Sequence, residues 1–424
     1  MRTQQVLIWT LVVLTCTGRA AWAQQPATSA DVVKLADLVA EAERKHPAIL
    51  AAARMVQAKR ARVPQARALP DPQLSIGYMG DPAPFKTQAN DPASYRQFGV
   101  MQEFPYPGKR ELRGKIAEKE VDAEGWNVEA ARRRVRAEVK LAYFELWGVD
   151  RALDTTQKNK DLLEKLARIA EERYKVGKGL QQDVLRAHVE VTRVLQRLTI
   201  LRQRRRTLEA RLNSLLLRPP DSPFGPLEAV EKSSFAYTLD ELLEKGVANA
   251  PEIRRQEQLI EQSQVAVNLA KRDYYPDFSV GWDYQNRGSG MPEMFGLRFT
   301  VNLPVFYKGK QRQALSEASF TLAATREIRE AVKTTLLFQV KEQYLTARAS
   351  EELLTLYAKG IVPQSMLALE SALAAYQVGS LDFLSLITNF ITVLDYEISY
   401  YEELANHQKA LARIEEITGI ELAK

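Results

Sequence analysis

The sequence contains the same unit twice. LADLVAEAERKHPAI, which begins at Leu35, aligns with LDELLEKGVANAPEI, which begins 204 residues later at Leu239. PQLSIGY from Pro72 and PDFSVGW from Pro276 are separated by the same 204 residues. Self-similarity at this period means that one structural module is built twice. Any fold of this chain must therefore contain two similar halves.

The first 23 residues are typical of a secretory signal. They combine Arg2, the apolar run VLIWTLVVLT and an Ala-Trp-Ala cleavage site that ends at Ala23. The one cysteine, Cys16, follows VLT rather than the small residues that a lipoprotein signal needs, so we expect cleavage near Gln24 without lipidation. The mature chain would then have no disulfide and no cysteine metal site.

We expect four parts in the chain. They are a signal peptide at 1–23, a first repeat at 24–216, a linker at 217–236 and a second repeat at 237–424. The linker begins LRPPDSPFGP, which is rich in proline and has no helical period. Each repeat should contain a helix, a pair of strands and a long helical hairpin.

Each repeat opens with a helical pattern, at 31–68 and at 237–272, and Thr238 begins a capping box in the second. Strand patterns follow. In LRFTVNL, the apolar residues from Leu297 to Leu303 alternate with polar ones, and Leu74, Ile76 and Tyr78 alternate in the same way in the first repeat. Period two gives each strand one apolar and one polar face. Pro105 and Pro304 should end the second strand of each pair, because proline cannot donate to the ladder.

Very long helical segments come next. We expect them at 109–174, 181–217, 309–376 and 382–418, with a kink at Pro363. A helix of 65 residues is on the order of 100 Å long. Apolar residues recur at heptad-like spacing, which is typical of a coiled-coil seam. The expected seam residues are Leu163, Ala167, Ala170, Tyr174, Met366, Leu369, Leu373 and Tyr376.

The long helices are interrupted twice by the same motif. YKVGKGLQQDVLRA begins at Tyr174, and YQVGSLDFLSLITN begins at Tyr376. Each Tyr-x-Val-Gly is followed at once by a new helical pattern, which indicates a helical hairpin. Such a turn needs residues that tolerate positive φ, and Gly177, Gly179 and Gly379 meet that need.

Four strands with one apolar face each cannot form a stable closed object alone. If the apolar face meets lipid, several chains must close one barrel, because lipid tolerates no open sheet edge. The pattern allows two chains or three. A small soluble sheet capping a coiled coil is the alternative.

Two tandem copies of helix, strand pair, long helix, Tyr-x-Val-Gly turn and long helix resemble the TolC family of outer-membrane efflux proteins. The resemblance implies a fold class that is mainly α with transmembrane β. Three chains would form a 12-stranded outer-membrane barrel in contact with lipid and an α-helical barrel across the periplasm of a Gram-negative bacterium. It also implies two partners: a periplasmic adaptor and an inner-membrane transporter, here of the resistance–nodulation–division type.

The resemblance assigns roles to the tips. It implies adaptor docking by Val176, Gly177, Gly179, Leu180, Val378, Gly379 and Leu381. It implies a periplasmic gate made by Asp183 and Tyr376, with Asp382 as a further acid. The second tip departs from the family's pattern, because Leu381 stands where an arginine is expected and Ser385 where an aspartate is expected.

The sequence gives no sign of an enzyme. His46, His188 and His407 have no metal-ligand spacing, and no phosphate loop or nucleophile motif is present, so we expect neither cofactor nor metal. The formal charge is +6, with 59 basic against 53 acidic side chains, which is near balance and does not suggest nucleic acid. The segment QEFPYPGKRELRG resembles members that serve heavy-metal efflux. Type I secretion, drug efflux and a periplasmic coiled coil that forms no channel remain alternatives.

Overall fold

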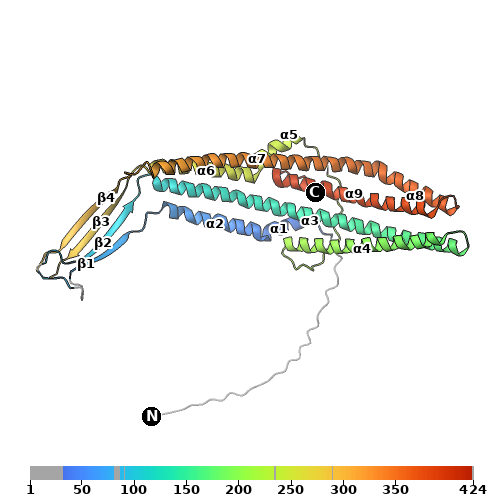
Figure 1. Ribbon diagram of the computed structural model, residues 1–424, viewed down its shortest axis with the longest axis horizontal. Helices are drawn as coiled ribbons and strands as arrows, with labels where there is room; N and C mark the ends of the chain where they lie inside the picture. The colour runs from blue at the N-terminus through green and yellow to red at the C-terminus, as the bar shows by residue number, and fades with distance from the viewer. Residues whose placement is uncertain (1–31, 81–85, 90, 234, 289, 423–424) are drawn as a thin grey trace, which may run out of the picture.

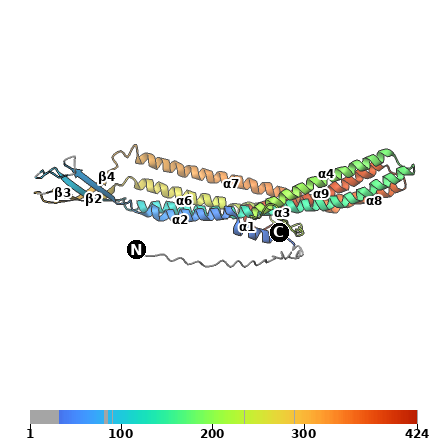
Figure 2. The ribbon, with the colours of Figure 1, turned by 90° about the horizontal axis from the view of Figure 1, so that it is seen from below.

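The computed structural model describes residues 32–80, 86–89, 91–233, 235–288 and 290–422. The expected signal peptide and Cys16 lie outside these ranges. The elements are α1 (Leu35–Lys45), α2 (Pro47–Arg67), β1 (Gln73–Met79), β2 (Tyr95–Phe104), α3 (Lys109–Lys175), α4 (Gln181–Leu215), α5 (Leu239–Asn249), α6 (Pro251–Arg272), β3 (Asp277–Asn286), β4 (Met294–Asn302), α7 (Gln311–Leu356), a π-helical turn η1 (Tyr357–Ile361), α8 (Val362–Gln377) and α9 (Phe383–Thr418). Long helices run side by side. The strands lie beyond one end of them, and the two turns that connect α3 to α4 and α8 to α9 lie at the other end (Figures 1 and 2).

Two short helices begin each half, where single helices at 31–68 and 237–272 were expected. The breaks fall just before Pro47 and Pro251, where the preceding residues have extended ψ angles of 126° and 124°. Proline disfavours the helical conformation in the residue before it and is well suited to start a helix. The capping box at Thr238 is confirmed.

The long helices are confirmed, with one change. Helix α3 runs without a break for 67 residues. The other long segment is α7, η1 and α8 in succession, and Pro363 lies in the first turn of α8. A kink was expected at Pro363, and the structure has a π-helical turn just before it, because proline lacks the N–H that would continue the helical ladder.

The predicted coiled-coil seam is only partly right. Leu163 and Ala170 are buried, and Tyr376 is 4% exposed. Tyr174 and Met366 are 47% and 44% exposed, so they lie outside the seam. The periodicity predicts which face of each helix is buried. It does not predict where the neighbouring helix moves away and leaves that face exposed.

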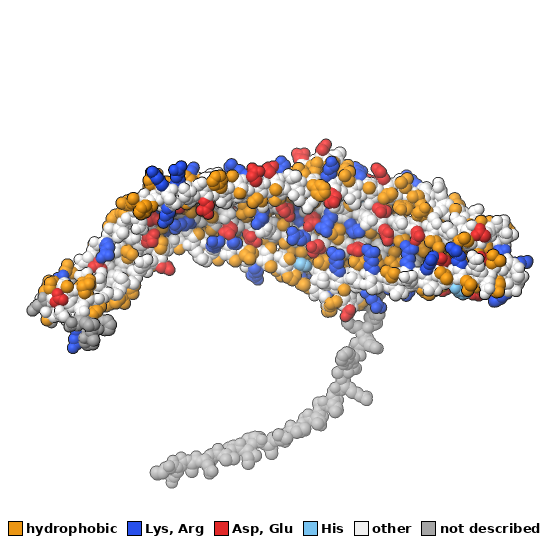
Figure 3. All heavy atoms as spheres, viewed as in Figure 1, with side chains coloured by type: hydrophobic (Ala, Val, Ile, Leu, Met, Phe, Trp, Pro, Cys, Tyr) orange, Lys and Arg blue, Asp and Glu red, His pale blue; other side chains and the backbone are white. Residues whose placement is uncertain are grey.

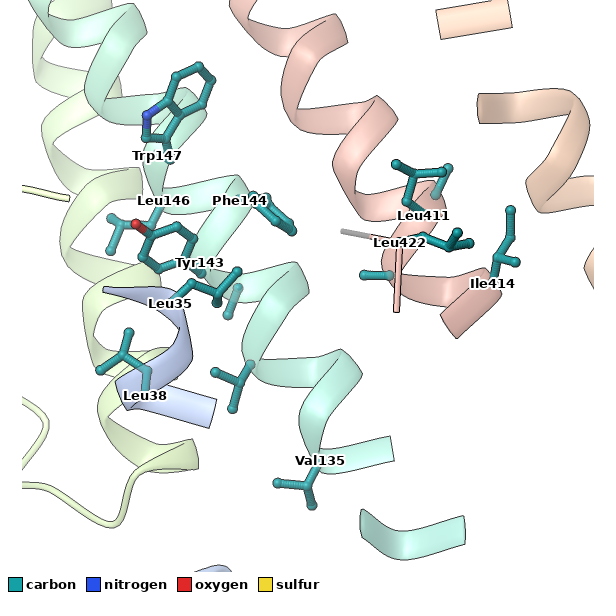
Figure 4. Packing of buried hydrophobic residues seen from close by; sticks show 14 of the residues in the cluster. Leu35, Leu38, Val135, Tyr143, Phe144, Leu146, Trp147, Leu411, Ile414 and Leu422 are labelled. Carbon is teal, nitrogen blue, oxygen red and sulfur yellow. The ribbon is translucent and has the colours of Figure 1, made fainter. Parts of the chain in front are cut away.

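The main core lies midway along the molecule, where α1 and α9 each pack on α3 (Figure 4). Tyr143, Phe144 and Trp147 of α3 are at most 3% exposed. The linker is also packed there. His407 and Gln408 of α9 hold its backbone, with His407 Nε2 3.3 Å from the Ser233 carbonyl oxygen and Gln408 Nε2 2.6 Å from that of Glu231.

The strands form one antiparallel sheet in the order β1-β2-β3-β4. The register aligns Leu74, Val100, Trp282 and Leu297 in a row across it. These four side chains are 70%, 44%, 47% and 84% exposed. The neighbouring row, on the opposite face, consists of Ser75, Gly99, Asp283 and Gly296. The predicted division into one apolar and one polar face is therefore confirmed, and the apolar face is uncovered.

The sheet has two free edges in a single chain. β1 and β4 are its outer strands, and each pairs with one neighbour only. Unpaired backbone groups at such edges are a template for pairing with another strand. Within the residues that the structure describes, no helix is both long enough and apolar enough to span a membrane.

Candidate functional site at the two helical tips

The first tip is a helix C-terminus closed by glycine. The N–H of Gly177 donates to the Tyr174 carbonyl at 3.0 Å, and that of Lys178 donates to the Arg173 carbonyl at 2.8 Å. These two bonds define a Schellman motif, in which the residue after the helix adopts a left-handed conformation. Gly177 has a φ of 74°, which suits a residue without a Cβ.

The second tip repeats this motif. Gly379 has a φ of 81° and donates to the Tyr376 carbonyl at 3.1 Å, while Ser380 donates to Ala375 at 2.9 Å. Gly179 was predicted to serve the turn through a positive φ, but its φ is not positive. A Cβ there would lie 3.1 Å from the backbone nitrogen of Tyr174, so this glycine allows a close backbone approach instead.

The helices that follow the two turns, α4 and α9, differ at their N-terminal caps. Asp382 caps α9, accepting hydrogen bonds from the Ser385 N–H at 3.0 Å and the Ser385 hydroxyl at 2.6 Å. These bonds from Ser385 lower the pKa of Asp382 below its usual value. Leu180 precedes α4 without a side-chain cap. Asp382 is thus placed as a capping residue of the second tip.

Apolar side chains point into solvent at both turns. Val176 and Leu180 are 65% and 66% exposed, and Val378 is 81% exposed. Leu381 is half-buried and packs against the core that the two tips share. The tips therefore present a small apolar surface next to a packed apolar cluster, in which Phe383 and Leu386 are fully buried.

An arginine joins the two tips. Arg173, near the end of α3, places its guanidinium carbon 4.6 Å from the centre of the Tyr376 ring. The same guanidinium donates to the Tyr376 backbone carbonyl. It also lies beside Gly379, where an added Cβ would be 3.3 Å from an Arg173 nitrogen. A cation over an aromatic face is attracted by the ring quadrupole.

Asp183 completes this cluster through its charge. Burial raises the pKa of the Tyr376 hydroxyl, the Arg173 cation opposes that rise, and the Asp183 carboxylate adds to it. The described residues contain no hydrogen bond between Asp183 and the hydroxyl of Tyr376. Arg173 therefore contacts Tyr376 directly, whereas Asp183 affects it only through its charge.

A role for Arg173 was not predicted. The resemblance implied an arginine in the second tip, where Leu381 stands, whereas the cation comes from the first tip. Arg173 precedes Tyr174 in the repeated motif, and a basic residue in the last turn of a helix is most simply explained by the helix dipole. Only the packing of one hairpin on the other reveals its contact with Tyr376.

The histidines lie apart. His188 pairs with Glu171 at 2.9 Å across the first hairpin, and His407 is buried between two backbone carbonyls. Within the described ranges, no cluster of His, Cys, Asp and Glu could hold a metal ion.

Comparisons with known proteins agree with this architecture. The family model described as "Outer membrane efflux protein" matches residues 38–216 and 242–419, one segment in each half. The cobalt-zinc-cadmium resistance protein CzcC of Cupriavidus metallidurans is 22% identical over 375 residues, which are 87% of this chain and 86% of that protein.

Solved structures share the fold. The outer membrane protein VceC of Vibrio cholerae has a TM-score of 0.77 at 18% identity, over 91% of this chain and 96% of that chain. CusC, whose structures concern folding and transmembrane channel formation, has a TM-score of 0.78 at 14% identity, over 91% of each chain.

Proposed function

Because the chain belongs to the outer membrane efflux protein family, we propose that three copies of it form the exit channel of a tripartite pump. In this proposal the channel crosses the outer membrane and the periplasm. A periplasmic adaptor and an inner-membrane transporter deliver heavy-metal cations to it. The chain itself is a passive channel and not an enzyme.

The sheet is the observation that carries the proposal. Its exposed apolar row from Leu74 to Leu297 would be unfavourable in water but suits contact with lipid tails. The polar row on the other face suits a water-filled lumen. Free edges at β1 and β4 require partners, and three four-stranded sheets would close a 12-stranded barrel without an edge.

The tips support adaptor docking at the opposite end. Val176, Leu180 and Val378 offer exposed apolar contacts, and Gly177 and Gly379 hold them in the same turn geometry. A partner that recognises one tip could therefore recognise the other. We assign adaptor docking to this surface, together with Gly179 and Leu381.

The cluster of Arg173, Tyr376 and Asp183 supports a resting gate. It ties the first hairpin to the second through a stacked cation and a backbone hydrogen bond. Opening of the periplasmic end would require the two hairpins to separate. Asp382 contributes by holding the start of α9 rather than by pairing across the tips.

The substrate assignment rests on two observations. The relative CzcC is named for cobalt, zinc and cadmium resistance. The segment QEFPYPGKRELRG, which joins β2 to α3, resembles members that serve heavy-metal pumps. Selection of the cation would lie mainly with the transporter.

Two measurements test the proposal. Native mass spectrometry in detergent should give three chains, and planar bilayers should show discrete channels. A stable monomer without conductance would contradict the channel.

For the substrate, the chain would be expressed in a host without its own exit channels. Paired with a heavy-metal adaptor and transporter, it should restore resistance to cobalt, zinc and cadmium. Restoration only with a drug-efflux pair would overturn the heavy-metal assignment.

A further inference from the structure

The turn between β4 and α7 exposes side chains of two kinds. We call it the junction patch, and it consists of Val305, Phe306, Tyr307, Lys308, Lys310 and Arg312. All six are exposed, and Phe306 reaches 85%. Figure 3 shows lysine and arginine side chains gathered where the strands meet the helices, next to hydrophobic ones. Large aromatic exposure beside concentrated positive charge is unusual on a surface that faces only water.

The exposure belongs to an ordered turn. The N–H groups of Gly309 and Lys310 donate to the Phe306 carbonyl at 3.1 and 3.2 Å, and that of Arg312 donates to Tyr307 at 2.8 Å. The Tyr307 ring lies 6.4 Å from that of Tyr274. The backbone is therefore fixed while the side chains of the patch point outward.

The equivalent turn in the first half is built differently. It is three residues shorter, with four positions from Pro105 to the start of α3 and seven from Pro304 to the start of α7. Lys109, which follows Gly108 as Lys310 follows Gly309, is 3% exposed and pairs with Asp277 at 2.9 Å and with Asp273 at 3.4 Å. Two residues after the shared proline, the first half has Pro107 and the second half has Phe306. The repeat therefore does not require an exposed, cationic turn, and its presence in one half calls for a separate explanation.

We propose that the junction patch binds the headgroups of anionic phospholipids in the leaflet that faces the helices. The inference rests on the proposed function, because it requires the strands to cross the membrane. Within the parts of the chain that the structure describes, Lys308, Lys310 and Arg312 form no ion pair, so they are available to phosphate oxygens. Val305 and Phe306 insert at the boundary of the acyl chains.

Continuity with the strand favours lipid as the partner. Leu297, Phe299, Val301 and Leu303 are exposed at two-residue spacing on one face of β4 and just after it, and Val305 keeps the spacing. The apolar face thus runs into the patch, and the cations begin where it ends. Aromatic and then basic residues in this order are typical of a membrane–water interface. Lysine is depleted at protein–protein interfaces, which makes a second copy the less suitable occupant.

The test uses the full-length assembly in vesicles of phosphatidylcholine, with and without phosphatidylglycerol. Spin-labelled lipids report the relative association of the two headgroups with the protein. The parent should prefer phosphatidylglycerol about threefold, below the ceiling of roughly fivefold per cation at a membrane surface. K308Q/K310Q/R312Q should reduce the ratio to about one, and high salt should do the same in the parent.

The matched control is R202Q/R206Q/K341Q, which removes three exposed cations from α4 and α7. It should keep the preference of the parent. An equal loss in both triple variants, or no preference in the parent, would overturn the inference.

A photoreactive benzoylphenylalanine at position 306 identifies the occupant directly. A phospholipid adduct supports the inference, and a crosslink to a second chain overturns it. Failure of the protein to float with vesicles of either composition would instead contradict the transmembrane strands, and with them the proposed function.

Discussion

At the scale of single residues, the contact between the two tips depends on the position of the Arg173 cation in the folded structure, which its place in the sequence does not reveal. Arg173 belongs to the first hairpin but touches Tyr376 of the second, through its ring and its backbone carbonyl. Tyr376 is 4% exposed, so little water competes for this contact. One side chain therefore connects the two hairpins at the point where the proposed opening would separate them.

Replacing Arg173 with glutamine should favour the open tip. The stacked cation is worth about 1–2 kcal/mol when partly shielded from water, and roughly 1.4 kcal/mol corresponds to a tenfold change in population. We expect R173Q to raise single-channel conductance or open probability in planar bilayers. K178Q, an exposed tip lysine, is the control and should conduct like the parent. Unchanged conductance in R173Q would place the gate elsewhere.

Tyr376 should also make the tips sensitive to alkali. Burial, with a smaller contribution from Asp183, raises its pKa above the usual value of 10.0, although Arg173 opposes this. The closed tip therefore keeps the phenol protonated at a pH where an exposed phenol ionises. This stabilisation is complete below pH 10.0 and is lost as pH rises towards the raised pKa. In planar bilayers, the conductance of the parent should increase as the pH rises above 10.0 towards the raised pKa, whereas that of Y376F should not.

At the scale of helices and strands, the local sequence patterns were sufficient to predict most of the elements. Alternation identified the strands, and periodicity identified the long helices, because both depend on which face of one element is buried. The exposure of Tyr174 and Met366 could not be predicted, since it depends on where neighbouring helices diverge. The role of Arg173 escaped for the same reason: its partner Tyr376 is 203 residues away.

The junction of β3 with α3 shows such a long-range contact. Lys109 is 3% exposed and donates to Asp277 and to the Tyr275 carbonyl, each at 2.9 Å. Removing one partner of a fully buried ion pair costs roughly 3–5 kcal/mol, because the other charge stays desolvated. The cost is smaller here, because Asp277 and Asp273 are 23% and 40% exposed and water can solvate them.

We therefore expect K109M to lower the melting temperature in neutral detergent by several degrees. K308M, the same change at an exposed lysine of the junction patch in the second half, should leave it unchanged. Equal melting temperatures for both variants would mean that the pair does not stabilise the junction.

At the scale of the whole molecule, one chain presents two different unpaired sides. α7 packs on α6 and α9, and its outer face exposes Phe320, Phe338 and Leu356 at 72%, 65% and 57%. These residues are separated by 18 positions, about five helical turns, so they form one stripe. α2 and α4 lie against the other side of α3. Contact between unlike sides of successive copies is head-to-tail, which closes into a ring when the rotation permits.

A charged residue in the apolar stripe on α7 should prevent successive copies from assembling into a ring. Burial of a phenylalanine contributes about 1.5–3 kcal/mol, and an unpaired carboxylate in its place would oppose burial further. We expect F338E to yield folded single chains by native mass spectrometry, with helical circular dichroism like that of the parent. Q339E adds the same charge at the next exposed position, about 100° around the helix, and should still assemble. If F338E assembles as well as Q339E, the contact between copies does not run along α7, and closure must rest on the strand edges alone.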